Sequence, residues 1–281
     1  NASLNDWHDE FVYCGFTGAD FSLAACAGFV SVYFYDETSA TDLDPDDGLT
    51  PATNITNNVS DGIGTLIYAS PGATTLSVSG SPEFDGFTKS ISKSSVDNDR
   101  GWNLIANPYP STLDWSQFYS DNSTLIEDGF HVFNEISSSY DSYSVADNID
   151  IAHSQSFWIK KTSVGSSNIS FDVSQTINSQ ANFLKSINGV NPHLIIDLEN
   201  LNNNKHDNAK ILASPTFNNV SNLGSDVSKL FSPDKEYVSN IYIIRDSNYL
   251  HRACINNNQN ASIKIGINSG SQSYGTHKIN F

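Results

Sequence analysis

The sequence predicts an all-β protein. Helical periodicity is nearly absent, whereas short runs of alternating apolar and polar residues, bounded by Gly, Pro, Asn, Asp and Ser, recur along the whole chain. Hydrophobic residues make up 38% of the 281 residues and aromatic residues 11%, which is typical of a folded chain rather than a disordered one. We expect two repeated β-sandwich-like modules followed by a C-terminal β-sandwich.

The first two modules are expected at residues 1–96 and 97–178, and they align as an internal repeat. Trp7 aligns with Trp102, residues 29–36 with 130–135, 65–68 with 157–160, and 75–79 with 168–172. A repeat of about ninety residues favours two similar modules packed together over a solenoid of small units. One short helix is expected at 114–119. The expected strands are 10–14, 29–35, 64–69, 75–79 and 87–92 in the first module, and 102–106, 129–134, 139–144, 156–160 and 168–173 in the second.

The third region, 179–281, is expected to form the C-terminal β-sandwich. A shift toward Asn and Ser near 176–182 indicates a linker, and the runs beyond it alternate at period two or are continuously apolar. The expected strands are 193–198, 209–212, 240–245, 251–255, 261–267 and 276–281.

The charge balance excludes some partners. Asp and Glu number 31 against 14 Lys and Arg, for a formal net charge of -17. Nucleic acid and anionic membranes would repel a chain this acidic. The sequence contains no run of 18 apolar residues, so it predicts no membrane-spanning helix. Because the chain contains no Met and begins at Asn1 without signal-peptide features, we expect a segment whose targeting signals have been removed.

The three cysteines suggest one disulfide. Cys14 and Cys26 lie twelve positions apart around a Gly-containing loop, which suits either a short disulfide in an oxidising compartment or two small buried thiols. The ligand spacing of a zinc site is absent. Cys254 is left over, and we expect it to be buried in its strand, with pairing between chains as the alternative.

A cluster of carboxylates suggests a calcium site. Asp42, Asp44, Asp46 and Asp47 alternate through a tight loop, and Ca²⁺ prefers oxygen ligands. The match to an EF-hand-type loop is partial, because Asp47 and Thr53 stand where that loop needs Gly and Glu. A solvated acidic loop is the alternative. Calcium is therefore the one cofactor that the sequence suggests.

The motif GWNLIANPYPSTLDW, at residues 101–115, is first of all a structural corner. Trp102 and Leu104 alternate with polar or outward residues in a strand, and Pro108 and Pro110 end that strand. Asp114 is placed to cap a short turn that carries Trp115 inward.

The same motif closely resembles a signature of Bacteroidota surface proteins exported by the type IX secretion system. Similar features continue at 129–134, 140–143, 154–161, 207–209, 226–232, 240–244 and 253–256. The resemblance implies a secreted, multi-module β-protein at the cell surface that normally precedes a C-terminal sorting domain, which we expect to lie outside these residues. It transfers no catalytic residues.

These observations favour a non-enzymatic extracellular structural or adhesive protein of the bacterial cell surface, which could assemble into a fibre or layer. Its expected partners are further copies of itself or surface polysaccharide. Assembly is expected at the terminal strand, 276–281, because an unpaired sheet edge is a template for another chain.

Two other functions stay open. The first is a carbohydrate-binding accessory region of a secreted polysaccharide-degrading protein, using Tyr109, Tyr140 and Tyr143 as stacking platforms if those rings are exposed. The second is a hydrolase with an unrecognised site, although no nucleophile, zinc-protease or phosphate-binding motif is present. The seven histidines are scattered, which favours core or surface roles.

Overall fold

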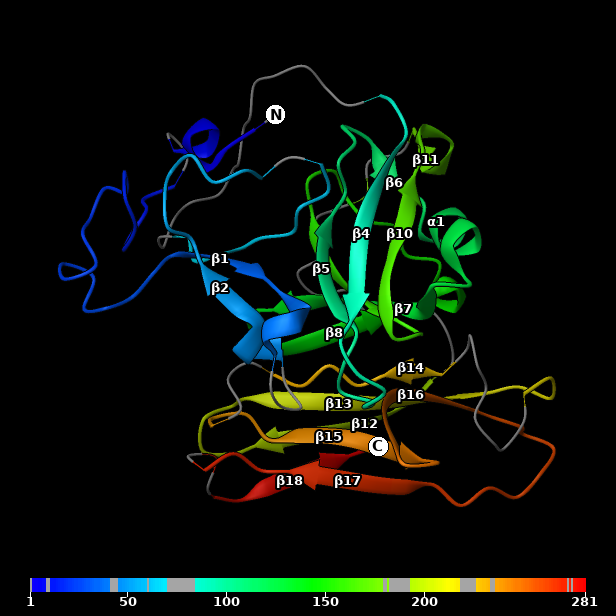
Figure 1. Ribbon diagram of the computed structural model, residues 1–281. Helices are drawn as coiled ribbons and strands as arrows, with labels where there is room; N and C mark the ends of the chain where they lie inside the picture. The colour runs from blue at the N-terminus through cyan, green and yellow to red at the C-terminus, as the bar shows by residue number, and fades with distance from the viewer. Residues whose placement is uncertain are drawn as a thin grey trace.

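The predicted all-β fold is confirmed. The computed structural model describes residues 2–8, 11–40, 45–59, 61–69, 84–178, 181, 193–217, 226–232, 236–271, 273 and 275–281, without the side chains of residues 45, 46 and 193. Within these residues the chain is built from several β-sheets and one short α-helix (Figure 1). None of the described helices has the length and apolar character needed to cross a bilayer.

The middle of the chain forms a sandwich. Its larger layer is an antiparallel sheet of order β5-β9-β7-β8, and its smaller layer is the antiparallel pair β4 and β10. Aromatic and branched side chains from both layers and from the helix fill the space between them. The elements are β4 (Phe87–Lys93), β5 (Trp102–Ala106), β6 (Thr112–Leu113), α1 (Trp115–Asn122), β7 (Ile126–Asn134), β8 (Ser139–Tyr143), η4 (Val145–Asp147), β9 (Ser156–Lys161), β10 (Gly165–Phe171), η5 (Val173–Gln175) and β11 (Thr176–Ile177).

The expected corner and helix follow β5. The Asn107 side chain ties the corner together, because its Nδ2 donates to the carbonyls of Ser111, Ile151 and Ala152 at 2.8–3.2 Å. The Asp114 carboxylate then caps α1 by accepting from the Gln117 backbone N–H at 3.0 Å.

The N-terminal region has little regular structure. Its small sheet has the order β2-β1-β3, and a compact core that includes Leu4, Tyr13 and Val32 lies beside it. The loop between Cys14 and β1 is held by turns and isolated bridges rather than by a strand ladder. The elements are η1 (Leu4–Trp7), β1 (Val32–Tyr35), η2 (Glu37–Ser39), η3 (Pro45–Gly48), β2 (Leu49–Pro51) and β3 (Leu66–Ile67).

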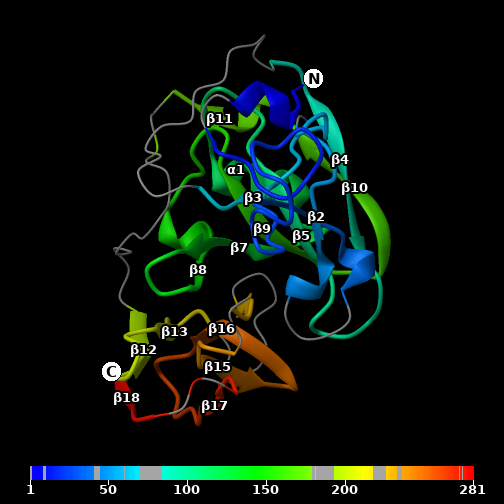
Figure 2. The same cartoon turned by 90° about the vertical axis from the view of Figure 1, so that its left-hand side faces the viewer.

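The C-terminal region is one curled sheet of order β17-β15-β16-β13-β12-β18, with β14 added alongside β16. Neighbours are antiparallel except β13 and β16, which are parallel. The two end strands of this order, β17 and β18, lie together at the bottom of the molecule in Figures 1 and 2. The strands are β12 (His193–Asn200), β13 (His206–Ala213), β14 (Val227–Ser228), β15 (Asn240–Arg245), β16 (Asn248–Ile255), β17 (Lys264–Asn268) and β18 (His277–Asn280).

The four-stranded sheet is covered on both faces. One face packs on β4, β10 and α1. The other carries Trp102 and Trp158, against which Tyr35 from β1 and Leu230 from the C-terminal region pack. The rings of Tyr35 and Trp158 meet edge to face at 4.6 Å between centroids. This sheet therefore joins the three regions of the chain.

Most of the expected strands are present with small shifts at their ends. β5 and β15 have the expected bounds, whereas the described residues of 10–14 form no strand beyond an isolated bridge at Cys14. The expected strand at 75–79 lies outside the described residues. The domain boundaries and the two-fold repeat remain predictions. β4, from the first expected module, pairs along its whole length with β10 of the second.

Candidate functional site

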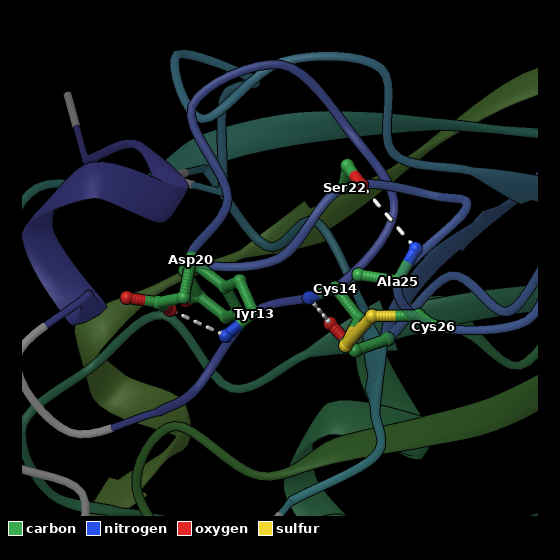
Figure 3. The surroundings of a disulfide bond; sticks show 7 residues. Tyr13, Cys14, Asp20, Ser22, Ala25 and Cys26 are labelled. Atoms are coloured by element: carbon green, nitrogen blue, oxygen red, sulfur yellow. Dashed lines mark hydrogen bonds between the residues drawn. A yellow bond between two sulfur atoms is a disulfide. The ribbon is translucent and has the colours of Figure 1, made fainter.

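The disulfide between Cys14 and Cys26 is confirmed (Figure 3). Their Cα atoms lie 6.1 Å apart, within the usual range for a disulfide. The segment around it is fixed by backbone N–H groups: that of Cys14 donates to the Ser31 hydroxyl at 2.9 Å, and that of Tyr13 to the Asp20 carboxylate at 2.8 Å. The disulfide therefore adds a covalent link to a loop that is held by turns within itself and by the backbone hydrogen bonds that Thr17 makes with Thr53 and Ile55.

Cys254 takes part in no disulfide, and it is fully buried as expected. Burial raises the pKa of its thiol to about 11. A buried thiol with a raised pKa is a poor nucleophile.

An apolar groove lies against the disulfide loop. Its volume is about 510 Å³. Leu23, which lines the groove, is 48% exposed, and Phe21, which precedes the lining residue Ser22 in the chain, is 51% exposed. We call this the disulfide groove. It is lined by Gly15, Phe16, Thr17, Ser22, Leu23, Val30, Pro51, Ala52 and Thr53.

A second cavity, of about 200 Å³, lies between the N-terminal region and the middle sandwich. Glu37 is 2% exposed, and its Oε1 accepts from the backbone N–H groups of Ser94 and Gly101 and from the Ser94 hydroxyl. Its Oε2 has no hydrogen-bond partner among the described residues. Lys89 also lines the cavity, and desolvation lowers the pKa of its amine. Two side chains of opposite charge thus share a small, largely polar space.

The described part of the predicted calcium loop leaves that prediction untested. Asp42 and Asp44 lie outside the described residues, and Asp46 lies in η3 without a described side chain. Asp47 is exposed at the end of η3. Among the described residues, no group of three or more His, Cys, Asp or Glu side chains is placed to hold a metal ion.

A buried polar interface joins the four-stranded sheet to the C-terminal sheet. Arg252 Nη1 contacts Asp147 Oδ2 at 3.0 Å and also bonds to the Ser144 hydroxyl. Lys160 Nζ bonds to the Ser228 hydroxyl at 3.0 Å. These two cationic residues are at most 5% exposed, so their side chains hold one sheet on the other rather than face solvent. We call this the inter-sheet interface.

Two histidines meet at the inter-sheet interface. The rings of His131 and His251 lie 6.3 Å apart, and each residue is 1% exposed. His131 Nδ1 lies 2.6 Å from the Ser142 hydroxyl, while neither ring nitrogen of His251 has a hydrogen-bond partner among the described residues. Burial, and then the nearby lysines, lower both histidine pKa values well below 6.5.

The pair of Ser142 and His131 has the spacing of a nucleophile and its base. Both residues are nonetheless buried under the C-terminal sheet, at 3% and 1% exposure. A substrate could not reach the serine hydroxyl in this arrangement. The sequence predicts scattered histidines with no contact between them, because His131 and His251 lie 120 positions apart and leave no local pattern.

The three tyrosines considered as stacking platforms are not exposed. Tyr109, Tyr140 and Tyr143 are 1–2% exposed and pack in the two cores of the middle sandwich. Tyr140 and Tyr143 lie on opposite faces of β8, both of which are covered, whereas Tyr109 lies in the corner between β5 and β6. The buried area of these rings stabilises the fold. The large exposed aromatic side chains in the described part of the chain are Phe21, Phe29, Tyr68, Phe84, Tyr237 and Phe281.

Comparison with known proteins adds no relative. No protein-family model, curated protein or solved structure matches this chain. The site geometry and the sequence are therefore the basis for any functional conclusion.

Proposed function

We propose that this protein is a non-enzymatic structural or adhesive protein of the bacterial cell surface, exported across the outer membrane, which assembles with copies of itself into a fibre or layer. The observation that carries the proposal is the unpaired outer edge of the C-terminal sheet. β18 and β17 end the strand order, and each hydrogen-bonds to one described neighbour only. Such an edge offers backbone groups to another chain.

Two further features support an extracellular role. The disulfide at Cys14 and Cys26 is of a kind that persists in oxidising compartments. The resemblance of residues 101–115 to surface proteins of the type IX secretion class agrees with that location. The strong negative charge would keep such a protein soluble outside the cell.

The non-enzymatic part of the proposal rests on accessibility. Two Ser–His pairs of the described residues have hydrogen-bond spacing, Ser142 with His131 at 2.6 Å and Ser239 with His277 at 2.8 Å, and both serines are buried, at 3% and 4% exposure. If the purified chain cleaved polysaccharides or peptides, with the activity lost in Ser142→Ala, this part of the proposal would be wrong.

The carbohydrate-binding alternative needs exposed aromatic rings other than the buried Tyr109, Tyr140 and Tyr143. Phe29 and Tyr68 are exposed at 41% and 56%, and their rings lie 5.0 Å apart. Their planes are inclined at 81°. Because a sugar ring stacks on a flat aromatic surface, this perpendicular pair offers one ring edge and one face rather than a platform. The geometry favours the structural role.

Negative-stain electron microscopy of the purified chain, over a range of concentrations and with calcium or a chelator, tests the proposal. We expect ordered fibres or sheets at high concentration. Loss of order in chelator would support the calcium loop at Asp42, Asp44, Asp46 and Asp47. Single particles in every condition would count against assembly, and a glycan array would then test the carbohydrate-binding alternative.

A further inference from the structure

Charge is divided very unevenly along this chain. Residues 1–88 contain 13 Asp and Glu and no Lys or Arg. Residues 247–281 contain no Asp or Glu but include Arg252, Lys264 and Lys278. Most of the net charge of -17 therefore belongs to the N-terminal region, and the last two strands of the chain are cationic.

In the part of the chain that the structure describes, the exposed cations lie on the two end strands of the C-terminal sheet. Among the described residues, Lys264 on β17 and Lys278 on β18 are the Lys and Arg side chains in the exposed class. The other described cations are buried or partly buried, as Lys160 and Arg252 are in the inter-sheet interface. Both end strands of the C-terminal sheet thus carry a positive charge on an otherwise acidic protein.

The same two strands leave part of an apolar face uncovered. Ile265 and Ile267 of β17 lie opposite Ile243 and Ile241, which are 0–1% exposed in the core of the C-terminal sheet. Directly paired residues project from the same face of a sheet, so the two β17 isoleucines extend that core face. They are nevertheless 41% and 48% exposed.

The strand at the other end repeats this pattern. Ile279 of β18 lies opposite the buried Leu198 and is 43% exposed, and Leu194 of β12 lies opposite Ile211 and is 49% exposed. The core of the curled sheet is therefore open along its two end strands. We call the set Leu194, Lys264, Ile265, Ile267, Lys278 and Ile279 the open rim.

The disulfide groove has the complementary character. It is apolar, Leu23 of its lining and the neighbouring Phe21 are exposed, and it belongs to the region that has no Lys or Arg. Asp20 lies next to Phe21 on the same loop, with its side chain 38% exposed. The backbone N–H of Tyr13 lowers the pKa of the Asp20 carboxyl, a group that is ionised at neutral pH even at its ordinary pKa.

We propose that the open rim of one copy docks on the disulfide groove of a second copy, so that the chains associate head to tail. The two surfaces lie apart on the molecule, with the disulfide loop at the left of Figure 1 and β17 and β18 at the bottom. They therefore do not satisfy each other within one chain. A contact between two different surfaces repeats without closing unless its rotation forms a ring, which gives a filament or a ring rather than a symmetric dimer.

This inference rests on the proposed self-assembly and names its contacts. It also makes the association sensitive to salt, because the Debye length falls from roughly 10 Å at 0.1 M to roughly 3 Å at 1 M salt. Apolar contact at the rim supplies affinity, and the opposite charges select the orientation of the two copies.

Sedimentation velocity with four variants tests the contact. The rim variant is Lys264→Gln with Lys278→Gln, and its control is Ser120→Asp with Ser166→Asp, which lowers the net charge by the same two units at exposed positions of the middle sandwich. The groove variant is Phe21→Ser with Leu23→Ser, and its control is Val96→Ser with Val164→Ser at positions 81% and 51% exposed. Far-UV circular dichroism checks that each variant is folded.

We expect the rim variant to weaken association roughly tenfold, since both exposed cations of the rim are removed, and the groove variant to weaken it as well. Both controls should associate like the unmodified chain. A mixture of the rim and groove variants should form heterodimers more readily than either variant associates alone, because one intact rim and one intact groove remain between them.

Three outcomes would overturn the contact. In the first, the unmodified chain associates and neither variant changes its association. In the second, the rim variant associates more weakly, but mixing it with the groove variant does not restore association. In the third, the unmodified chain stays monomeric. The first two leave self-assembly standing and refute only its geometry. Binding of the monomeric chain to immobilised cell-surface polysaccharide would then judge the adhesive part of the proposed function separately.

Discussion

Replacing Lys229 by Met should strongly destabilise the C-terminal sheet. Lys229 Nζ lies 2.6 Å from both carboxylate oxygens of Asp207, and the two side chains are 1% and 0% exposed. Asp207 Oδ2 also accepts from the Ile241 backbone N–H at 2.8 Å. The carboxylate thereby joins β13, β15 and the segment after β14. Met is similar in length to Lys but leaves the buried carboxylate without its countercharge.

The expected loss is about 3–5 kcal/mol in the free energy of unfolding, the usual cost of breaking a fully buried ion pair. Asp207→Asn alone should cost a similar amount, because it leaves the Lys229 ammonium buried. The double variant should cost only about 1–3 kcal/mol, since neither charge remains and an amide oxygen can still accept from Ile241.

Urea denaturation followed by two signals measures these differences. All four Trp residues precede the C-terminal sheet, so tryptophan fluorescence reports the N-terminal and middle regions, whereas far-UV circular dichroism reports all strands. A loss below about 1 kcal/mol in Lys229→Met, or a double variant as unstable as the sum of the single variants, would refute the role given to this ion pair.

Three other predictions concern the remaining regions. Burial lowers the pKa values of His131 and His251, so the folded state favours their neutral forms. Their contribution to the free energy of unfolding is therefore complete above the unfolded-state pKa of about 6.5 and is lost as the pH falls. We expect up to about 2 kcal/mol of lost stability per histidine between pH 6.5 and 5, measured by urea denaturation, and a flatter profile in His251→Gln. Asp114→Ala removes the cap of α1 and should cost about 1 kcal/mol in the same assay, whereas a change of a few tenths would contradict the capping role. Replacing Cys14 and Cys26 by Ala removes the link between two residues twelve positions apart and should lower the free energy of unfolding by about 3 kcal/mol. A protease should then cleave residues 1–69 faster than in the unmodified chain, and equal resistance of the two chains would contradict this.

The sequence was informative where the alternation of residue types matches the strand period. The run from Asn240 to Arg245 is bounded by polar residues and is rich in isoleucine, and it forms β15 with the expected ends. The Pro-containing corner after Ala106 and the cap at Asp114 were equally predictable, because Pro and Asp act on the backbone within a few residues.

Long-range contacts were not predictable in this way. The meeting of His131 with His251 and the burial of Tyr140 depend on which sheet covers the four-stranded sheet, and no local pattern specifies that. The N-terminal region was predicted least well. Its chain between Cys14 and Cys26 is held by a disulfide and single bridges, which leave no periodic pattern in the sequence.

The double covering of the four-stranded sheet has a consequence for the order of folding. Any process that delivers the chain from its N-terminus, such as synthesis on a ribosome, releases Tyr35 and Leu49 long before Trp158, a member of the cluster against which they pack. Until β9 emerges, these apolar side chains have no sheet to cover, and the sheet in turn waits for Leu230. The face of the N-terminal region that carries Tyr35 and Leu49 therefore stays exposed to solvent until most of the chain is available, even though that region has a core of its own.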